Sequence, residues 1–128
     1  KMYNKPVIYA WLEAGGENSH ILKIDYSKKG CFECLYTGED GSLINNKANT
    51  VTDEIVESNT IRNGCGGTRV AYGNEVLLRT TSVLLDTVKN VFNNIDQDNY
   101  IIDIQPTNVV NKGNIFAERK CNCCSDKD

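Results

Sequence analysis

The chain has 128 residues, of which 40% are hydrophobic and 24% charged, and it contains 6 cysteines but only 2 prolines. This composition is that of one globular domain, long enough to fold without needing disulfides or a metal. A net charge of -3 with no basic cluster argues against nucleic-acid binding, and the apolar runs are too short to span a membrane.

The start of the chain bears on whether the protein is secreted. The only methionine, Met2, follows a single residue, Lys1. We expect that Met2 is the initiator, that Lys1 is left over from a tag, and that no signal peptide is involved. The alternative is a mature secreted chain, since cysteine-rich chains are often secreted.

The first third of the chain predicts β-hairpins. Residues 7–13 form an apolar, β-favouring run, and residues 20–26 alternate between two faces as a strand does. After a turn at residues 27–30, the alternation continues over residues 31–37, which predicts a third strand.

The middle of the chain is less regular. A turn at residues 38–41 leads to a short strand around Leu43 and Ile44. The polar stretch 45–67 is expected to lie on the surface with one short element. Residues 68–72 and 75–80 then predict a hairpin about the turn Gly73-Asn74.

Residues 83–95 predict an amphipathic helix, capped by Ser82. Its apolar residues recur at helical spacing and are expected to pack on a sheet: Leu84, Leu85, Val88, Val91, Phe92 and Ile95.

Two further β elements are expected after the helix. A strand over residues 100–105 ends at Pro106, and a hairpin of residues 107–110 and 115–120 follows. The sequence therefore predicts an α+β domain over residues 1–120, a mainly antiparallel sheet of hairpins with one helix on one face, and a cysteine-rich tail over residues 121–128.

Two C-x2-C pairs raise the question of a zinc site formed by Cys31, Cys34, Cys121 and Cys124. An extended strand over residues 31–37 would hold Cys31 and Cys34 roughly 10 Å apart with side chains on opposite faces. We therefore expect that these two cysteines neither bind one metal nor bridge each other. No cofactor is expected, and zinc is the alternative.

A glycine-rich segment around Cys65 is a weak candidate for binding a ligand. Gly64, Gly66 and Gly67 could wrap an anion with backbone amides, but the segment lacks the lysine of a phosphate loop. Arg69 and Arg79, expected on the two arms of one hairpin, could hold an anionic small molecule.

Enzymatic chemistry has little support in the sequence. A cysteine hydrolase would need Cys65 as the nucleophile and His20, the only histidine, as the base, with Asp25 or Asp103 orienting the imidazole. A cysteine and a histidine occur together by chance in many chains, so we expect no enzyme.

Three cysteines near the C-terminus, Cys121, Cys123 and Cys124, predict a disulfide clasp that also involves Cys31, Cys34 and Cys65. We expect a structural or assembly subunit, such as a spore-surface or virion component, whose tail forms disulfides within or between subunits. Its partner would be further copies of itself, in an oxidising location that the protein reaches after synthesis.

Two alternatives remain open. One is a small cytoplasmic module of the kind that phages or plasmids encode, which binds a ligand or a protein and keeps its cysteines reduced or bound to zinc. The other is a secreted, disulfide-rich effector.

Overall fold

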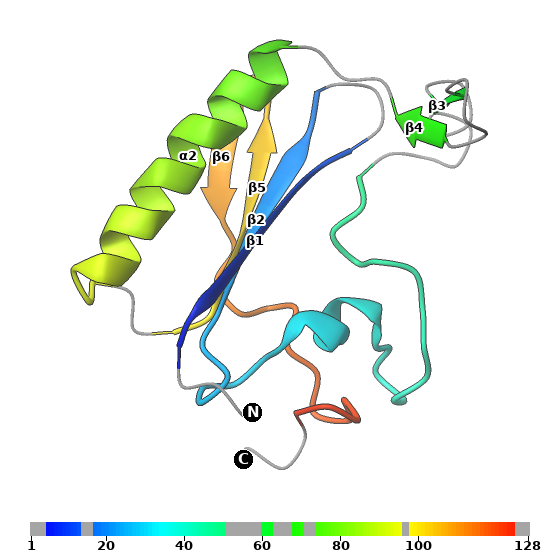
Figure 1. Cartoon of the computed structure of the whole chain (residues 1–128). Helices are drawn as coiled ribbons and strands as arrows, with labels where there is room; N and C mark the ends of the chain where they lie inside the picture. The colour runs from blue at the N-terminus through cyan, green and yellow to red at the C-terminus, as the bar shows by residue number, and fades with distance from the viewer. Residues whose placement is uncertain are drawn as a thin grey trace.

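A computed structural model of the chain describes residues 5–13, 17–50, 60–62, 68–70, 74–95 and 98–124. Its main sheet is antiparallel and has the strand order β1-β2-β5-β6. One long helix, α2 (Asn74–Phe92), covers one face of this sheet, as Figure 1 shows. The predicted α+β class, with an antiparallel sheet and one packed helix, is confirmed. The strands of the sheet are β1 (Val7–Leu12), β2 (Ser19–Ile24), β5 (Tyr100–Gln105) and β6 (Asn108–Asn111).

The period-2 alternation of the strands divides the core into two layers. On the α2 side, Ile21 of β2 packs with Tyr100, Ile102 and Ile104 of β5. On the opposite side, Leu22 and Ile24 form a second core with the 3-10 helix η1 (Phe32–Tyr36) and the C-terminal segment. Every residue of β2 is buried, because the strand lies between two neighbours and is covered on both faces.

The smaller β3–β4 hairpin, Thr60–Arg62 with Thr68–Val70, forms a separate two-stranded sheet. The strand expected around Leu43 is present only as an isolated bridge between Thr37 and Leu43. Neither described helix combines the length and the hydrophobicity that crossing a membrane requires.

The helix begins at Asn74, about two and a half turns before the start that the sequence predicted at residue 83. Residues 75–80 are helical rather than the arm of a hairpin, and Ser82 is an exposed residue inside α2 rather than its cap. Both expectations were wrong, because a six-residue stretch with apolar positions fits a strand and a turn and a half of helix equally well. Arg79 donates to Glu75 at 3.0 Å one helical turn away, a pair that only the helix allows.

The sheet covers a narrower face of α2 than its apolar pattern predicted. Val76, Thr80 and Thr87 are buried against the sheet. Leu84, Val88 and Val91 are half-buried, as expected for packed residues, whereas Leu85, Phe92 and Ile95 are 57%, 82% and 62% exposed. The expectation that these last three pack on the sheet was wrong, because the sheet covers the side of α2 that carries Val76, Thr80 and Thr87, and Ile95 lies beyond the end of the helix.

The C-terminal region also differs from the prediction. The strand over residues 100–105 is confirmed, but it pairs directly with β6 through a turn at Pro106 and Thr107. The expected arm 115–120 is a series of turns instead. These turns bring Phe116 and Cys121 into the core on the face opposite α2, which an extended arm would not do.

Candidate metal centre

The backbone of the first C-x2-C pair forms the start of a short helix and not an extended strand. In place of the expected strand over residues 31–37, residues 32–36 form η1 with Cys31 as its N-cap, and Cys34 N–H donates to the Cys31 carbonyl at 3.1 Å. The Sγ atoms of Cys31 and Cys34 consequently lie 3.8 Å apart. The prediction that these side chains diverge was wrong, because the ring of Phe32 packs against both Tyr36 and Tyr9 of β1, and this packing favours a short helix.

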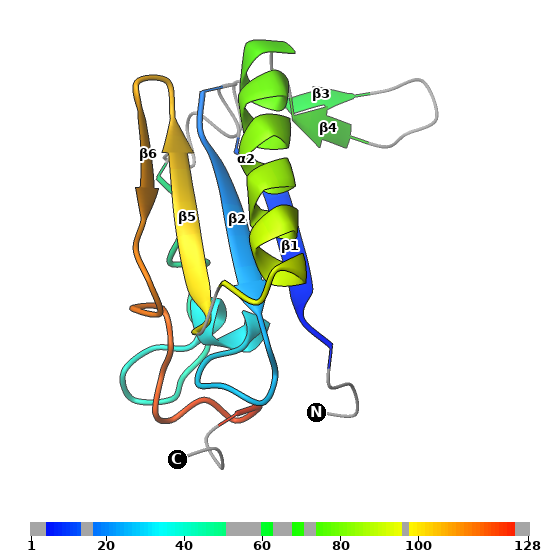
Figure 2. The ribbon, with the colours of Figure 1, turned by 90° about the vertical axis from the view of Figure 1, so that its left-hand side faces the viewer.

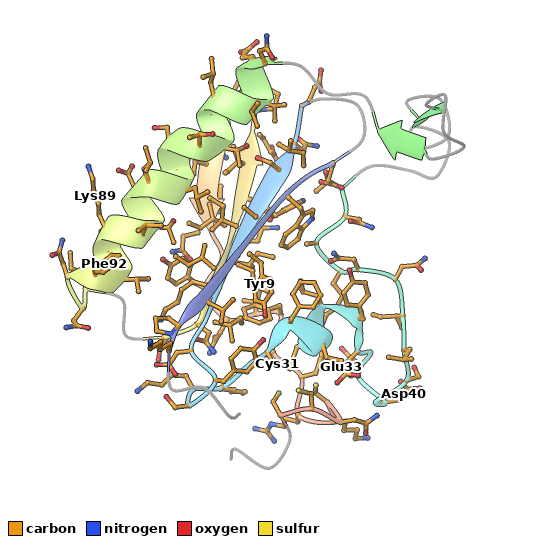
Figure 3. All side chains as sticks on the ribbon, viewed as in Figure 1. Tyr9, Cys31, Glu33, Asp40, Lys89 and Phe92 are labelled. Carbon is orange, nitrogen blue, oxygen red and sulfur yellow. The ribbon has the colours of Figure 1, made fainter. Side chains whose placement is uncertain are left out.

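The second pair approaches the first from the C-terminal segment. Cys121 N–H donates to the Glu118 carbonyl at 3.4 Å, and the following turn brings Cys124 back toward the core. The Sγ atoms of Cys31 and Cys121 lie 3.6 Å apart, and those of Cys34 and Cys124 lie 3.4 Å apart. The segment carrying these cysteines passes beside η1, where Cys31 is labelled in Figure 3.

The four sulfurs have the spacing of ligands around one ion. They are buried and lie within 4.8 Å of one another. A zinc–sulfur bond of about 2.3 Å in a tetrahedron separates the sulfurs by about 3.8 Å. A disulfide would need about 2.05 Å, and an iron–sulfur cluster needs a wider cage because several irons fit between the ligands. The geometry therefore suits one tetrahedral metal ion.

The thiols differ in how readily they lose a proton. The hydrogen bond from the Cys31 thiol lowers the pKa of Cys34 to about 4 despite burial, helped by backbone hydrogen bonds from Glu118 and Cys31. The same contact raises the pKa of Cys31. Burial, together with Cys34, raises the pKa of Cys124 to about 12. Hydrogen bonding thus favours a thiolate at Cys34 beside neutral thiols at Cys31 and Cys124.

Polar contacts fasten the segments that carry the two pairs. The Nζ of Lys47 donates to the Phe116 carbonyl at 3.0 Å and to Glu118 Oε1 at 2.6 Å, just before Cys121. The buried side chain of Asn99 donates to the Gly30 carbonyl at 3.2 Å, just before Cys31. Hydrogen bonds from other parts of the chain therefore anchor the segment that precedes each cysteine pair.

The remaining candidate residues are not brought into this cluster. Cys123 is exposed, and Arg79 lies in α2, so it does not share a hairpin with Arg69 of β4. Cys65 and the glycines Gly64, Gly66 and Gly67 fall outside the described residues, as does the Arg69 side chain.

A second polar cluster surrounds His20, which is 1% exposed. Its Nδ1 lies 2.8 Å from Asp103 Oδ1, and its Nε2 lies 2.7 Å from Glu13 Oε2. The sequence had offered Asp103 as one candidate partner for this histidine, but nothing in it indicated Glu13. Thr50 completes the cluster by donating its N–H and hydroxyl to the Glu13 carboxylate at 2.7 and 2.6 Å.

A pocket of about 330 Å³ lies between the two clusters. Its charged groups are already paired across it, Lys47 with Glu118 and Lys112 with Asp103. Among the described residues that line it, the pocket therefore presents no unpaired charge that would select an ionic ligand.

The chain matches no protein-family model, no curated protein and no solved structure.

Proposed function

We propose that the chain is a non-enzymatic, zinc-stabilised α+β binding module. A single Zn²⁺ would be held by Cys31, Cys34, Cys121 and Cys124 as thiolates. The observation that carries the proposal is the convergence of four buried sulfurs, two from η1 and two from the C-terminal segment, within 4.8 Å.

The donor set favours a structural rather than a catalytic role for the metal. Catalytic zinc sites have three protein ligands and keep one position for water or substrate, whereas structural sites use four. Here four thiols surround the centre, and each is buried. The ion would close a loop of most of the chain by joining η1 to the C-terminal segment, which adds stability to the core on that face.

A second candidate function is the expected assembly subunit, closed by disulfides. The distances of 3.6 Å and 3.4 Å pair Cys31 with Cys121 and Cys34 with Cys124, and oxidation would join these pairs within one chain. Cys123 remains exposed and available for a bond to another copy. The zinc proposal ranks first because all four sulfurs, and not only two pairs, lie close together.

Metal analysis and intact mass distinguish the two proposals. The chain is purified without reductant or chelator, exchanged into metal-free buffer, and measured by native and denaturing mass spectrometry together with elemental analysis. We expect one zinc per chain, retained on dilution and removed by a strong chelator. A mass lowered by the hydrogens lost in disulfide formation, without metal, would favour the assembly subunit. Iron in place of zinc would contradict the zinc assignment.

A further inference from the structure

Strand β1 lies at the edge of the main sheet, and no described strand pairs with its outer side. Its six residues, Val-Ile-Tyr-Ala-Trp-Leu, include no charge and no proline, and β2 is its only strand partner among the described residues. Edge strands expose unpaired backbone N–H and C=O groups, and monomeric proteins usually guard them with charges, proline or a bulge. β1 lacks these side-chain guards along its length.

The adjoining side of α2 is apolar as well. A hollow of about 220 Å³ separates the helix from β1 and is lined mainly by Ala10, Trp11, Leu12, Leu77, Thr81 and Leu84. Of these, Leu77 is 43% exposed, and Phe92, farther along this side of the helix, is 82% exposed. Phe92 and Lys89 are labelled on this helix in Figure 3. The apolar surface therefore continues from the strand edge onto the helix.

The position of α2 over the sheet allows two copies to meet on this side. Figure 2 shows α2 in front of β1 and β2, and it contacts both strands. Strands are spaced by about 4.8 Å, so a helix centred between β1 and β2 lies about 5 Å from a two-fold axis beside β1. Two such helices would then lie about 10 Å apart, which is the distance at which helices pack.

We propose that this surface, made of the β1 edge and the outer apolar side of α2, binds a second copy of the chain. The two β1 strands pair antiparallel across a two-fold axis and continue the sheet, while the two α2 helices pack side by side. A second copy is the occupant that fits, because an antiparallel strand without charges meets no like charge when it pairs with itself. The inference does not depend on the metal centre.

The test measures mass against concentration for the full, zinc-loaded chain in reductant, which removes links through Cys123. We expect a dimer that dissociates on dilution, and hydrogen exchange at β1 that slows as concentration rises. Leu77→Glu and Phe92→Glu should each raise the dissociation constant by about 100-fold or more, because each charge enters the interface twice. Ala10→Lys places a charge on β1 and should raise the dissociation constant of the dimer in the same way.

Ile115→Glu is the matched control, because Ile115 is 72% exposed on a turn after β6, away from β1. It should leave the dimer intact, and circular dichroism should show that every variant is folded. A wild-type chain that remains monomeric at about 1 mM would overturn the proposal. So would a dimer that survives Leu77→Glu, Phe92→Glu and Ala10→Lys, or one in which β1 exchange is independent of concentration.

Discussion

His20 and Asp103 lie directly opposite each other on β2 and β5, and their side chains join Nδ1 to Oδ1 at 2.8 Å in the buried sheet face opposite α2. Glu13 contacts the other ring nitrogen at 2.7 Å, and Lys112 contacts the second Asp103 oxygen at 2.7 Å. The ring of Trp11 lies against the imidazole, 5.2 Å between centroids. A protonated His20 therefore balances two buried carboxylates together with Lys112.

This arrangement predicts a defined pH dependence of stability. Burial lowers the pKa of His20, but hydrogen bonds to Glu13 and Asp103 outweigh it and raise the pKa above the ordinary 6.5. The contribution of His20 to the free energy of unfolding is thus complete below pH 6.5 and is lost as the pH rises through the raised pKa. Burial raises the pKa of Glu13, but hydrogen bonds from His20 and Thr50 hold it below 4.5, so its contribution is lost as pH falls through that lowered pKa.

Thermal unfolding from about pH 5 to 9 checks this dependence. We expect the wild-type Tm to fall toward alkaline pH. His20→Gln should be less stable by about 3 kcal/mol near pH 6, because it leaves buried carboxylates without their cation, and its alkaline decline should be smaller. Equal alkaline slopes for the two proteins would contradict this role, since His20 is the only histidine.

The metal centre predicts unequal effects for two neighbouring cysteines. Cys124→Ser removes a buried ligand of the proposed zinc site and should weaken zinc binding by more than about 100-fold, since even hydrogen-bond partners of ligands contribute about 10- to 100-fold. Cys123→Ser is the matched control, because Cys123 is exposed and outside the cluster. Competition with a chromogenic chelator measures both affinities. Equal affinities in the two variants would exclude Cys124 as a ligand.

Gly30 has a packing role that substitution can measure. Its φ of +99° suits glycine, and an added Cβ would meet the Phe116 ring at 3.1 Å and Ala117 Cβ at 3.3 Å. Gly30→Ala should lower the free energy of unfolding by about 2 to 3 kcal/mol. Gly113→Ala, at φ +62° with no atom within 4 Å, should cost about 1 kcal/mol. Urea unfolding gives both values, and similar costs would show that the contact with Phe116 is unimportant.

Two residues of α2 distinguish the sheet-facing side from the outer side. Phe92→Ala should cost under about 1 kcal/mol in the diluted monomer, because the ring is already 82% exposed. Val76→Ala should cost about 1 to 3 kcal/mol, because Val76 is 1% exposed. Chemical denaturation at low protein concentration measures both. A larger loss for Phe92→Ala would mean that the helix is turned differently on the sheet.

The sequence by itself determined the α+β class and the strands that carry the core. The apolar run of β1 and the alternation in β2 and β5 are local signals, because side chains on a strand must alternate between two faces whatever the rest of the chain does. The spacing of the two C-x2-C pairs likewise identified the four candidate zinc ligands.

Only the tertiary structure decided whether those ligands meet. Residues 31–37 alternate as a strand would, yet the aromatic contacts of Phe32 with Tyr9 and the turn at Gly30 favour a short helix there. The approach of Cys124 to Cys34 joins segments separated by 90 residues, and no local pattern encodes it. Packing against the sheet face opposite α2 favours both η1 and the approach of the C-terminal segment. In this arrangement the two segments bury apolar surface that an extended strand would leave in water.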